Sequence, residues 1–455
     1  MPRLSGKLKQ LQDKKIAVLG LGIENSALVK FLFQNNIPCE LVVCDIRPEA
    51  ELKEKMEELS EFFYKSRSTK LSLNLGPGYD DHLEEYDVIM RSPGYPLFSS
   101  NLIKAVTQRE KKGDIRNFFI NSPMKLFFDV CPAGIIGVTG TKGKGTTASL
   151  IAHILEQGGK RVFLGGNIGV APFDFIDKVE KNDWVVLELS SFQLEDIHKS
   201  PHIAVFTNFY KEHLSSADIH NPNYHKRLRD YWRAKLNIFR WQTKKDLAVV
   251  NDNLKMFLAS YGFKSNFYYF TKSDLESSLM GEHNRENVAA AERVAHLLKI
   301  KKEVVKKAVK SFSPLPHRLE FVKEKGGVNY YNDSFATTPD SAITALRSFS
   351  SPVILLAGGA DKGSDFAGMS REIKEKVKFV ILFDGAGSVK LQKELRHIGF
   401  SQERMKVACS MEEAMEEAHR QAAFGDTVLL SPGCASFGIF KNYKQRGELF
   451  KMYCQ

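Results

Sequence analysis

The sequence predicts an α/β protein that is built from three domains. A length of 455 residues corresponds to roughly three domains of typical size. Apolar runs that end in glycine turns alternate with helical patterns along the chain, which is typical of parallel sheets. Two stretches interrupt this alternation: residues 113–123, which are polar and contain Gly and Pro, and residues 314–318, which contain two prolines. We therefore expect Rossmann-like domains at residues 1–116 and 314–455, and a central domain with a mostly parallel sheet at residues 117–313.

The composition is that of an ordinary globular protein. The net charge of +11 is spread along the chain, so small polyanionic substrates fit it as well as nucleic acid does, and no nucleic-acid recognition motif is present. No apolar run approaches the roughly 20 residues of a membrane span, and the first residues show no secretory signal. The six cysteines lack paired spacing and predict free thiols. We expect a cytoplasmic, monomeric protein that binds neither nucleic acid nor membrane.

The first segment begins with a strand, a Gly-x-Gly turn and a helix. A strand-like apolar run leads into Gly20 and Gly22, and a helical pattern follows. A second apolar run, residues 39–44, ends at Asp45, where dinucleotide-binding folds place the acidic residue that contacts a ribose. Asn25 occupies the place of the third glycine of that fingerprint, so the pattern favours a nucleotide-type ligand over NAD. A nicotinamide-dependent oxidoreductase is the alternative.

A polar turn follows the third apolar run of this segment, residues 87–90. The turn contains Ser92, Pro93 and Gly94. Doubly wound sheets bind their ligands at the edge formed by the carboxyl ends of the strands, and this turn is expected at that edge. An ordinary strand-to-helix connection is the alternative interpretation.

The central segment contains a phosphate-loop pattern at residues 137–147. A strand-like run precedes it, a helical pattern follows it, and a Gly-Lys pair that ends at Lys144 lies between the two. Backbone N–H groups of a glycine loop, the helix N-terminus and the ammonium group together favour a bound phosphate. Gly145 stands where a strict phosphate loop has a hydroxyl, and Thr146 or Thr147 could supply that hydroxyl to Mg²⁺. The sequence therefore predicts a P-loop-type domain.

Further polar residues follow the other strand-like runs of the central segment. These runs are expected at residues 161–164, 184–188, 203–207, 247–250 and 267–270. Glu188 ends one run and is placed to hold Mg²⁺, as a Walker-B acid does, although a strand-end ion pair is possible. His213 could bind the metal or form a hydrogen bond, and Lys235 in a helical pattern is usually exposed to solvent. Asn284 and Asn287 could cap a helix or contact a nucleotide base.

The third segment repeats the strand and glycine-turn pattern. Apolar runs at residues 353–356, 380–383 and 428–430 each end near a glycine, and helical patterns separate them. This pattern predicts a third, smaller α/β domain.

Taken together in chain order, these motifs resemble the Mur ligase superfamily, and within it the branch that adds D-glutamate. The resemblance covers nearly the whole chain. The motifs that carry it are the loop 140–147, the strand end 187–195, Gly166-Asn167-Ile168-Gly169, Glu212-His213, Ala234-Lys235-Leu236, His283-Asn284 with Asn287, Pro316-His317-Arg318, Asn332-Asp333-Ser334, and the C-terminal run from Ser431 to Gly447.

The resemblance implies an ATP-dependent, amide-forming ligase of peptidoglycan precursor synthesis. Its substrates would be UDP-N-acetylmuramoyl-L-alanine, D-glutamate and ATP, with Mg²⁺ as the metal and an acyl phosphate as intermediate. The implied catalytic residues are Lys144, Glu188, His213 and Lys235. The implied metal ligands are Thr146, Glu188, His213 and Lys235, the last as a carbamate that acts like a carboxylate.

The resemblance also assigns a substrate to each domain. The central domain would bind ATP, with further contacts from the third domain, through Gly140, Thr141, Lys142, Gly143, Lys144, Gly145, Thr146, Thr147, Asn284, Asn287, Arg318 and Asp333. The UDP-substrate would contact the first domain and the central strand ends through Gly22, Asp45, Arg47, Ser92, Pro93, Gly94, Asn167, Ser190 and Gln193. The third domain would receive the amino acid at Thr337, Lys362, Ser436, Phe437 and Tyr443.

Two departures from the family pattern bear on these expectations. Phe335 stands where the D-glutamate-adding enzymes usually have lysine, and the run 335–340 instead resembles ligases that add later residues. A Mur-type ligase for another amino acid is therefore an alternative. Gly145 replaces the usual Ser or Thr, and Lys142 replaces the usual Asn and adds charge beside the phosphates. A folylpolyglutamate-synthase-like ligase fits less well because that family lacks the first domain.

Overall fold

The computed structural model describes residues 6–66, 68–214, 222–361 and 363–455. They form two compact units. The first unit comprises the chain up to Ser273 together with Glu286–Ala308, and the second comprises Asp274–Arg285 together with Val309–Gln455. The first unit holds two sheets and the second holds one, so the expected three-sheet α/β architecture is confirmed.

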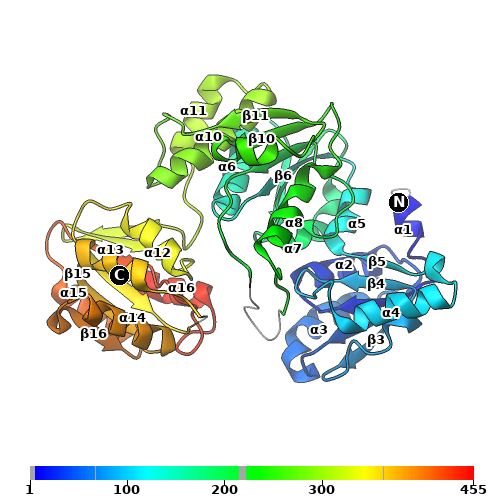
Figure 1. The fold of residues 1–455 in the computed structure, drawn as a ribbon, viewed down its shortest axis with the longest axis horizontal. Helices are drawn as coiled ribbons and strands as arrows, with labels where there is room; N and C mark the ends of the chain where they lie inside the picture. Colours follow the sequence, from blue (N-terminus) through cyan, green and yellow to red (C-terminus); the bar gives the residue numbers. More distant parts are fainter. Residues whose placement is uncertain (1–5, 67, 215–221, 362) are drawn as a thin grey trace. The chain divides into compact units, whose positions relative to one another are not determined.

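The first sheet is parallel and has the strand order β3-β2-β1-β4-β5. Its strands are β1 (Lys15–Leu19), β2 (Cys39–Asp45), β3 (Thr69–Leu75), β4 (Val88–Arg91) and β5 (Phe119–Asn121). Helices of this part of the chain, shown in Figure 1, are α1 (Gly6–Lys9), α2 (Ile23–Gln34), α3 (Glu49–Phe63), α4 (Ser100–Lys111) and α5 (Pro123–Val130). The carboxyl ends of β1, β2 and β4 are neighbours in this order, so the turns that follow them gather at one edge.

The second sheet is also parallel, with the order β11-β10-β9-β6-β8-β7. Its strands confirm all six expected runs: β6 (Gly134–Thr139), β7 (Val162–Gly166), β8 (Trp184–Glu188), β9 (Ile203–Phe206), β10 (Leu247–Asn251) and β11 (Asn266–Phe270). The helices that accompany them are α6 (Lys144–Gln157), α7 (Ser191–Leu194), α8 (Leu228–Arg240), α9 (Lys255–Leu258), α10 (Glu282–Leu297) and α11 (Lys302–Ser311). β6 lies between β8 and β9, which places its glycine loop beside the ends of both.

The third sheet is mixed and has the order β12-β13-β17-β14-β15-β16. Its strands are β12 (Glu320–Lys325), β13 (Val328–Asn332), β14 (Val353–Gly358), β15 (Val377–Phe383), β16 (Met405–Ala408) and β17 (Thr427–Leu430). Only the hairpin of β12 and β13 is antiparallel among the described pairs. The helices here are α12 (Pro339–Leu346), α13 (Ala367–Lys376), α14 (Ala386–His397), α15 (Met411–Gln421) and α16 (Tyr443–Tyr453).

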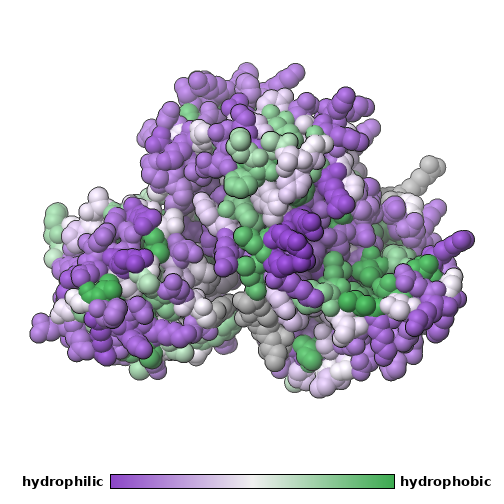
Figure 2. Space-filling model, in the orientation of Figure 1, coloured by the Kyte–Doolittle hydropathy of each residue, from purple (hydrophilic) through white to green (hydrophobic). Residues whose placement is uncertain are grey.

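The central strands of the sheets are buried on both faces. β14 of the third sheet, with the sequence VILLAG and a parallel neighbour on each side, is buried at every residue, as expected for a strand covered by helices on both sides. Hydrophilic residues occupy most of the molecular face in Figure 2, with smaller hydrophobic areas between them. Within the described ranges, no helix has the length and apolar character needed to cross a membrane. All six cysteines are free, as their spacing predicts.

The structure adds strands that the sequence patterns do not predict. β3 and β12 are edge strands with exposed charged or polar residues, so they lack a continuous apolar run. β5 pairs with β4 and extends the first sheet to Asn121, past the boundary expected at residue 116. The functional division of the chain at residues 116 and 313 stays a prediction.

Candidate active site

The glycine loop after β6 has a backbone that only glycine adopts easily. Gly140 and Gly143 have φ angles of +148° and +78°. A Cβ atom on Gly140 would collide with the hydroxyl of Thr207, and one on Gly143 would collide with the side-chain oxygen of Asn287. Thr147 in the first turn of α6 donates its hydroxyl to the same Asn287 oxygen over 3.2 Å. The loop is therefore shaped by close packing as well as by φ.

Two lysines of the loop are held by different acceptors. Lys144 begins α6 and its ammonium donates to the Thr141 carbonyl over 2.9 Å. The Lys142 ammonium lies 2.6 Å from a carboxylate oxygen of Glu212. Burial alone would raise the pKa of Glu212, but the charge and the hydrogen bond of Lys142, added to weaker effects of nearby positive charge such as that of Lys144, together outweigh burial and hold that pKa below its ordinary value. Glu212 is thus an anion beside the phosphate loop.

Lys235 on α8 points into the core instead of solvent. The side chain is buried, and its nitrogen donates to the Gly140 carbonyl over 2.7 Å and lies 4.8 Å from the centre of the Tyr231 ring. The usual interpretation of a helical lysine as solvent-exposed is therefore wrong here. Burial first, and then the charge on Lys144, lowers the pKa of Lys235 well below its ordinary value. A neutral, nucleophilic amine is therefore favoured beneath the loop.

Glu188 lies at the buried end of β8, next to β6 in the sheet. One of its carboxylate oxygens accepts a hydrogen bond from the Asn167 amide over 2.8 Å. The Asn167 backbone N–H also donates to the Glu188 carbonyl over 2.9 Å, which fixes the segment after β7 against the end of β8. Glu188 contributes to the electrostatic surroundings of Lys235. The two expected residues, Glu188 and Asn167, are therefore brought together beside the loop.

His213 lies within range of the same charges and has an uncommon backbone. Its φ angle is +60°, and its ring packs against those of Phe192 and Tyr231 at centroid distances of 5.3 and 5.6 Å. Desolvation, together with the positive charges of Lys235 and Lys144, lowers the pKa of His213 to about 4. The imidazole is therefore neutral at physiological pH, which is the form that binds metals.

The residues here fit Mg²⁺ held partly by substrate phosphates. Among the described residues, no three His, Cys, Asp or Glu side chains form a metal cluster by themselves. Mg²⁺ is usually held by one or two carboxylates, phosphate oxygens and water, so Glu188 and a hydroxyl suffice on the protein side. Thr146 is buried in the first turn of α6, whereas the Thr147 hydroxyl is bonded to Asn287. Thr146 thus stays the expected replacement for the hydroxyl missing at Gly145.

A second group of expected residues gathers at the edge of the first sheet. Asp45 accepts hydrogen bonds from the Leu21 N–H over 2.7 Å and from the Arg47 guanidinium over 2.9 and 2.6 Å. Burial would raise the pKa of Asp45, but these hydrogen bonds outweigh it and lower that pKa. Ser92 lies against Gly20, whose added Cβ would be 2.7 Å from the Ser92 hydroxyl. The sheet order therefore brings Gly22, Asp45, Arg47, Ser92, Pro93 and Gly94 to one edge.

Ser190 and Gln193 form a reciprocal cap at the start of α7. The Ser190 hydroxyl accepts from the Gln193 N–H, and the Gln193 side chain accepts from the Ser190 N–H. The Gln193 amide also donates to Glu24 on α2. Glu24 is half-buried, and desolvation of its carboxyl group raises its pKa to about 7. Both expected UDP-substrate residues of this segment therefore lie beside the first sheet's edge.

The second unit contains most of the expected amino-acid contacts. The guanidinium of Arg318 lies 3.8 Å from the centre of the Phe335 ring, and Phe335 packs edge-on against Tyr443 at 5.0 Å. Asp333 is buried, its oxygens accept from the Leu319 N–H and the Ser431 hydroxyl, and burial raises its pKa to about 7.

The remaining expected residues of the second unit differ in exposure. Ser436 is buried, Thr337 is half-buried and Phe437 is exposed. Asn284 donates its side-chain amide to the Met280 carbonyl over 2.6 Å. Lys362 lies outside the described residues. The unit therefore offers Arg318, Phe335 and Tyr443 as one aromatic and cationic cluster.

Sequence reasoning missed several residues of the first unit. Glu212 was noted only as a neighbour of His213, and Asn208, which accepts from the Lys142 N–H over 2.8 Å, was not singled out. The Tyr231 hydroxyl lies 3.1 Å from that of Thr141 and ties α8 to the loop. Their place after a strand could have identified them: Asn208 and Glu212 both follow β9, which neighbours β6 in the sheet.

Comparison with known proteins agrees with this geometry. Three domain families match in chain order: the Mur ligase MurD-like N-terminal domain at residues 14–111, the Mur ligase middle domain at 138–273, and the Mur ligase, glutamate ligase domain at 317–434. Among solved structures, the chain is similar to the UDP-N-acetylmuramate–alanine ligase MurC of Thermotoga maritima, with a TM-score of 0.58 and 18% identity over 97% of this chain and 99% of that one. The MurF ligase of the same organism, solved in complex with ADP, gives a TM-score of 0.58 and 15% identity over 91% and 94%. These two likenesses show a shared fold.

Sequence similarity to curated proteins is stronger. The UDP-N-acetylmuramoylalanine–D-glutamate ligase of Acetivibrio thermocellus is 35% identical over 99% of this chain and 98% of its own length. The protein of the same name from Clostridium tetani is 36% identical over 97% of each chain. The resemblance inferred from the ordered motifs is thereby confirmed, and the chain belongs to the Mur ligase family.

Proposed function

We propose that this chain is an ATP-dependent ligase that joins D-glutamate to UDP-N-acetylmuramoyl-L-alanine, with ADP and phosphate as the other products. The observation that carries the proposal is the cluster around the glycine loop, where Lys142, Lys144 and Lys235 lie with Glu188 and Glu212. Relatives over nearly the whole chain bear the name of this ligase, which supports the substrate assignment.

The chemistry requires two transfers at one carboxylate. The alanyl carboxylate attacks the γ-phosphoryl group of ATP, ADP leaves, and an acyl phosphate forms. The amine of D-glutamate then attacks the acyl carbon, loses a proton, and the tetrahedral intermediate expels phosphate to leave an amide. Lys144 and Lys142 would neutralise charge on the transferring phosphoryl group, and the loop N–H groups would orient it.

Lys235 is proposed to act as a carbamate. Its lowered pKa leaves a neutral amine, and a neutral amine can add to carbon dioxide to give a carbamate anion. Thr146 and Glu188 would hold a first Mg²⁺, and His213 would hold a second that it shares with the carbamate; the charge of the metal would stabilise the phosphoryl oxygens. The imidazole of His213 is in the neutral form that metal binding needs.

The substrate contacts are proposed by domain. The edge of the first sheet would bind the UDP portion at Gly22, Asp45, Arg47 and residues 92–94, while Asn167, Ser190 and Gln193 would contact the muramoyl portion. ATP would contact the loop 140–147 together with Asn284, Asn287, Arg318 and Asp333. D-Glutamate would contact Thr337, Ser436, Phe437 and Tyr443, together with Lys362. Monomeric state and the lack of nucleic-acid binding stay predictions.

Phe335 supports a second candidate within the same reaction type. It places an aromatic ring where the D-glutamate branch usually has a lysine, and the ring is stacked under Arg318 and beside Tyr443. Arg318 could supply the positive charge that the missing lysine would have given. Alternatively, the aromatic surface could select a less acidic amino acid, as in the ligases that add later residues.

The test is phosphate release with a panel of acceptors and amino acids. The protein is incubated with ATP, Mg²⁺ and either UDP-N-acetylmuramoyl-L-alanine or its D-glutamyl product, with D-glutamate, L-glutamate, L-lysine or diaminopimelate. We expect turnover only with the alanyl acceptor and D-glutamate, and none when any component is omitted. Turnover with only the D-glutamyl acceptor and a diamino acid would favour the second candidate. Lack of turnover in every combination would contradict both.

A further inference from the structure

Arg91 is a buried cation at the edge where the UDP portion is proposed to bind. It is the last residue of β4, in the interior of the first sheet, and its side chain is fully buried. A buried guanidinium is stabilised by hydrogen bonds from its N–H groups, and in Arg91 the two terminal nitrogens make such bonds, whereas the buried Nε has no partner among the described residues. Arg91 immediately precedes the turn formed by Ser92, Pro93 and Gly94, so the position of Arg91 and the position of the turn are directly linked.

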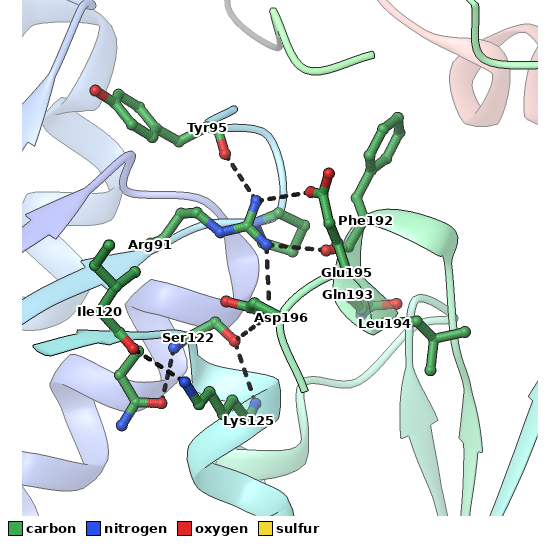
Figure 3. A network of polar contacts seen from close by, with 12 residues as sticks. Arg91, Tyr95, Ile120, Ser122, Lys125, Phe192, Gln193, Leu194, Glu195 and Asp196 are labelled. Atoms are coloured by element: carbon green, nitrogen blue, oxygen red, sulfur yellow. Dashed lines mark hydrogen bonds and ion pairs between the residues drawn. The ribbon is translucent and has the colours of Figure 1, made fainter. Parts of the chain in front are cut away.

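The partners of Arg91 come from two parts of the chain about one hundred residues apart, as Figure 3 shows. One terminal nitrogen donates to the Tyr95 carbonyl over 2.8 Å and lies 3.5 Å from a Glu195 carboxylate oxygen. The other donates to the Phe192 carbonyl over 3.0 Å and lies 3.4 Å from Asp196. The same guanidinium therefore closes the turn after β4 and holds the segment that contains α7.

Asn223 makes a second connection between the same two regions. Its backbone N–H donates to the Gly94 carbonyl over 3.2 Å, and its side-chain amide donates to the Pro93 carbonyl over 2.8 Å. The turn at residues 92–94 is therefore held by Arg91 from one side and by Asn223 from the other.

These contacts fix the distance between the two halves of one proposed substrate site. The turn 92–94 belongs to the proposed UDP contacts, and Ser190 and Gln193 on the other side of Arg91 belong to the proposed muramoyl contacts. A substrate that spans both groups binds more tightly when the two are already held in place, because less freedom is lost on binding.

We propose that Arg91 is a positioning residue for the UDP-substrate, which joins the 92–94 turn to the α7 segment so that both ends of the substrate meet a preformed site. The inference rests on the proposed function, since it assigns the two groups to one ligand. Arg91 does not touch the reacting atoms in this role. Its planar fork reaches two carbonyls and two carboxylates at once, which a lysine ammonium cannot do.

The test compares Arg91→Lys with Arg109→Lys. Arg109 is a matched control because it also bonds a carbonyl, that of Tyr86, and a carboxylate, that of Asp114, but only within the first-sheet region. For Arg91→Lys we expect the KM for UDP-N-acetylmuramoyl-L-alanine to rise by about tenfold to a hundredfold, the range of a charge-assisted hydrogen bond, with the KM for ATP unchanged. Arg109→Lys should leave both constants near those of the unsubstituted chain.

Binding measurements separate positioning from a general loss of folding. By calorimetry, Arg91→Lys should weaken the binding of UDP-N-acetylmuramoyl-L-alanine more than the binding of UDP. The reason is that UDP is proposed to contact the 92–94 turn but not the α7 segment. Asn223→Ala should show the same pattern, and it serves where Arg91→Lys fails to fold. An equal loss of affinity for UDP and for the full substrate would overturn the proposal. An unchanged KM for UDP-N-acetylmuramoyl-L-alanine in a folded Arg91→Lys variant would also overturn it. Turnover of the unsubstituted chain tests the proposed function separately from these variants.

Discussion

The two glycine turns of the first unit share one backbone plan but differ in what fills the space in front of them. Both connect a parallel strand to a helix N-terminus, β1 to α2 and β6 to α6. In the first turn the chain's own carboxylate, Asp45, accepts the Leu21 N–H, and Lys55 donates to the Leu21 carbonyl over 2.7 Å. In the second turn the nearby carboxylates are bonded to side chains, Glu212 to Lys142 and Glu188 to Asn167.

This difference explains why the transferring phosphoryl group of ATP is proposed to lie at the second turn, while the first turn is proposed to contact UDP. A helix N-terminus attracts an anion in either place, so the backbone does not distinguish the two turns. The first turn already holds the carboxylate of Asp45 on one of its N–H groups, whereas the second places the ammonium groups of Lys142 and Lys144 beside the loop. A strand-glycine-helix pattern therefore indicates where a ligand can bind, and the side chains around it decide the class of ligand.

The largest expected effect follows from removing the buried lysine of the second turn. Lys235→Ala should lower kcat by at least about a hundredfold, because it removes a group proposed to stabilise transition-state charge. Added formate or acetate should restore part of the activity by replacing the carbamate. Lys55→Ala removes the lysine that holds a carbonyl of the first turn, and its kcat should stay within about threefold. Phosphate release measures all variants. Full activity of Lys235→Ala would exclude the carbamate, and equal losses in both variants would remove the distinction between the turns.

The fold was largely predictable because the central strands are continuous apolar runs followed by glycines. β6 and β14 are of this kind, and β8 is a continuous apolar run that ends at Glu188; each was expected within one or two residues. β3, with the sequence TKLSLNL, lies at a sheet edge, and leucines alternate in it with polar residues. Its pairing with β2 therefore depends on tertiary contacts that a local pattern does not contain.

The candidate site was predictable where chemistry follows a strand end directly. Glu188 and Lys144 are of this kind. Lys235 could be recognised only through family resemblance, because a lysine on a helix carries no local sign of burial. Arg91 gave no local signal. Its partners on the α7 segment lie about one hundred residues away in sequence, and they are the Phe192 carbonyl and two carboxylates, none of which is marked in the sequence as a partner of an arginine. Long-range pairing of a charged residue is set by the fold, not by its neighbours in the chain.

A smaller effect should separate the two turns by their tolerance of a methyl group. Gly140→Ala places a Cβ against Thr207 at a φ of +148°, so we expect a destabilisation of about 1–3 kcal/mol. Gly22 has a φ of −79° and no atom within 4 Å of an added Cβ, so Gly22→Ala should change stability by less than about 0.5 kcal/mol. Urea unfolding of both variants measures this. Similar losses in the two variants would show that the second turn is no more tightly packed than the first.

The smallest effect concerns Glu24, which begins the helix after the first turn and has no acidic counterpart in the first turn of α6. Its pKa is about 7 in the folded chain, above the ordinary value of 4.5, because its carboxyl group is desolvated. The folded state therefore binds more protons than the unfolded state between these values, and stability falls as pH rises through that window.

Glu24→Gln removes this pH dependence of stability, while its side-chain oxygen can still accept a hydrogen bond from Gln193. The melting temperature of Glu24→Gln relative to the unsubstituted chain should rise from pH 5 to pH 7 and then level off, while the exposed control Glu54→Gln should give a constant difference. A Glu24→Gln difference that does not vary with pH would mean that this carboxyl group is charged across the whole pH range, in the folded as in the unfolded chain, and would contradict the prediction.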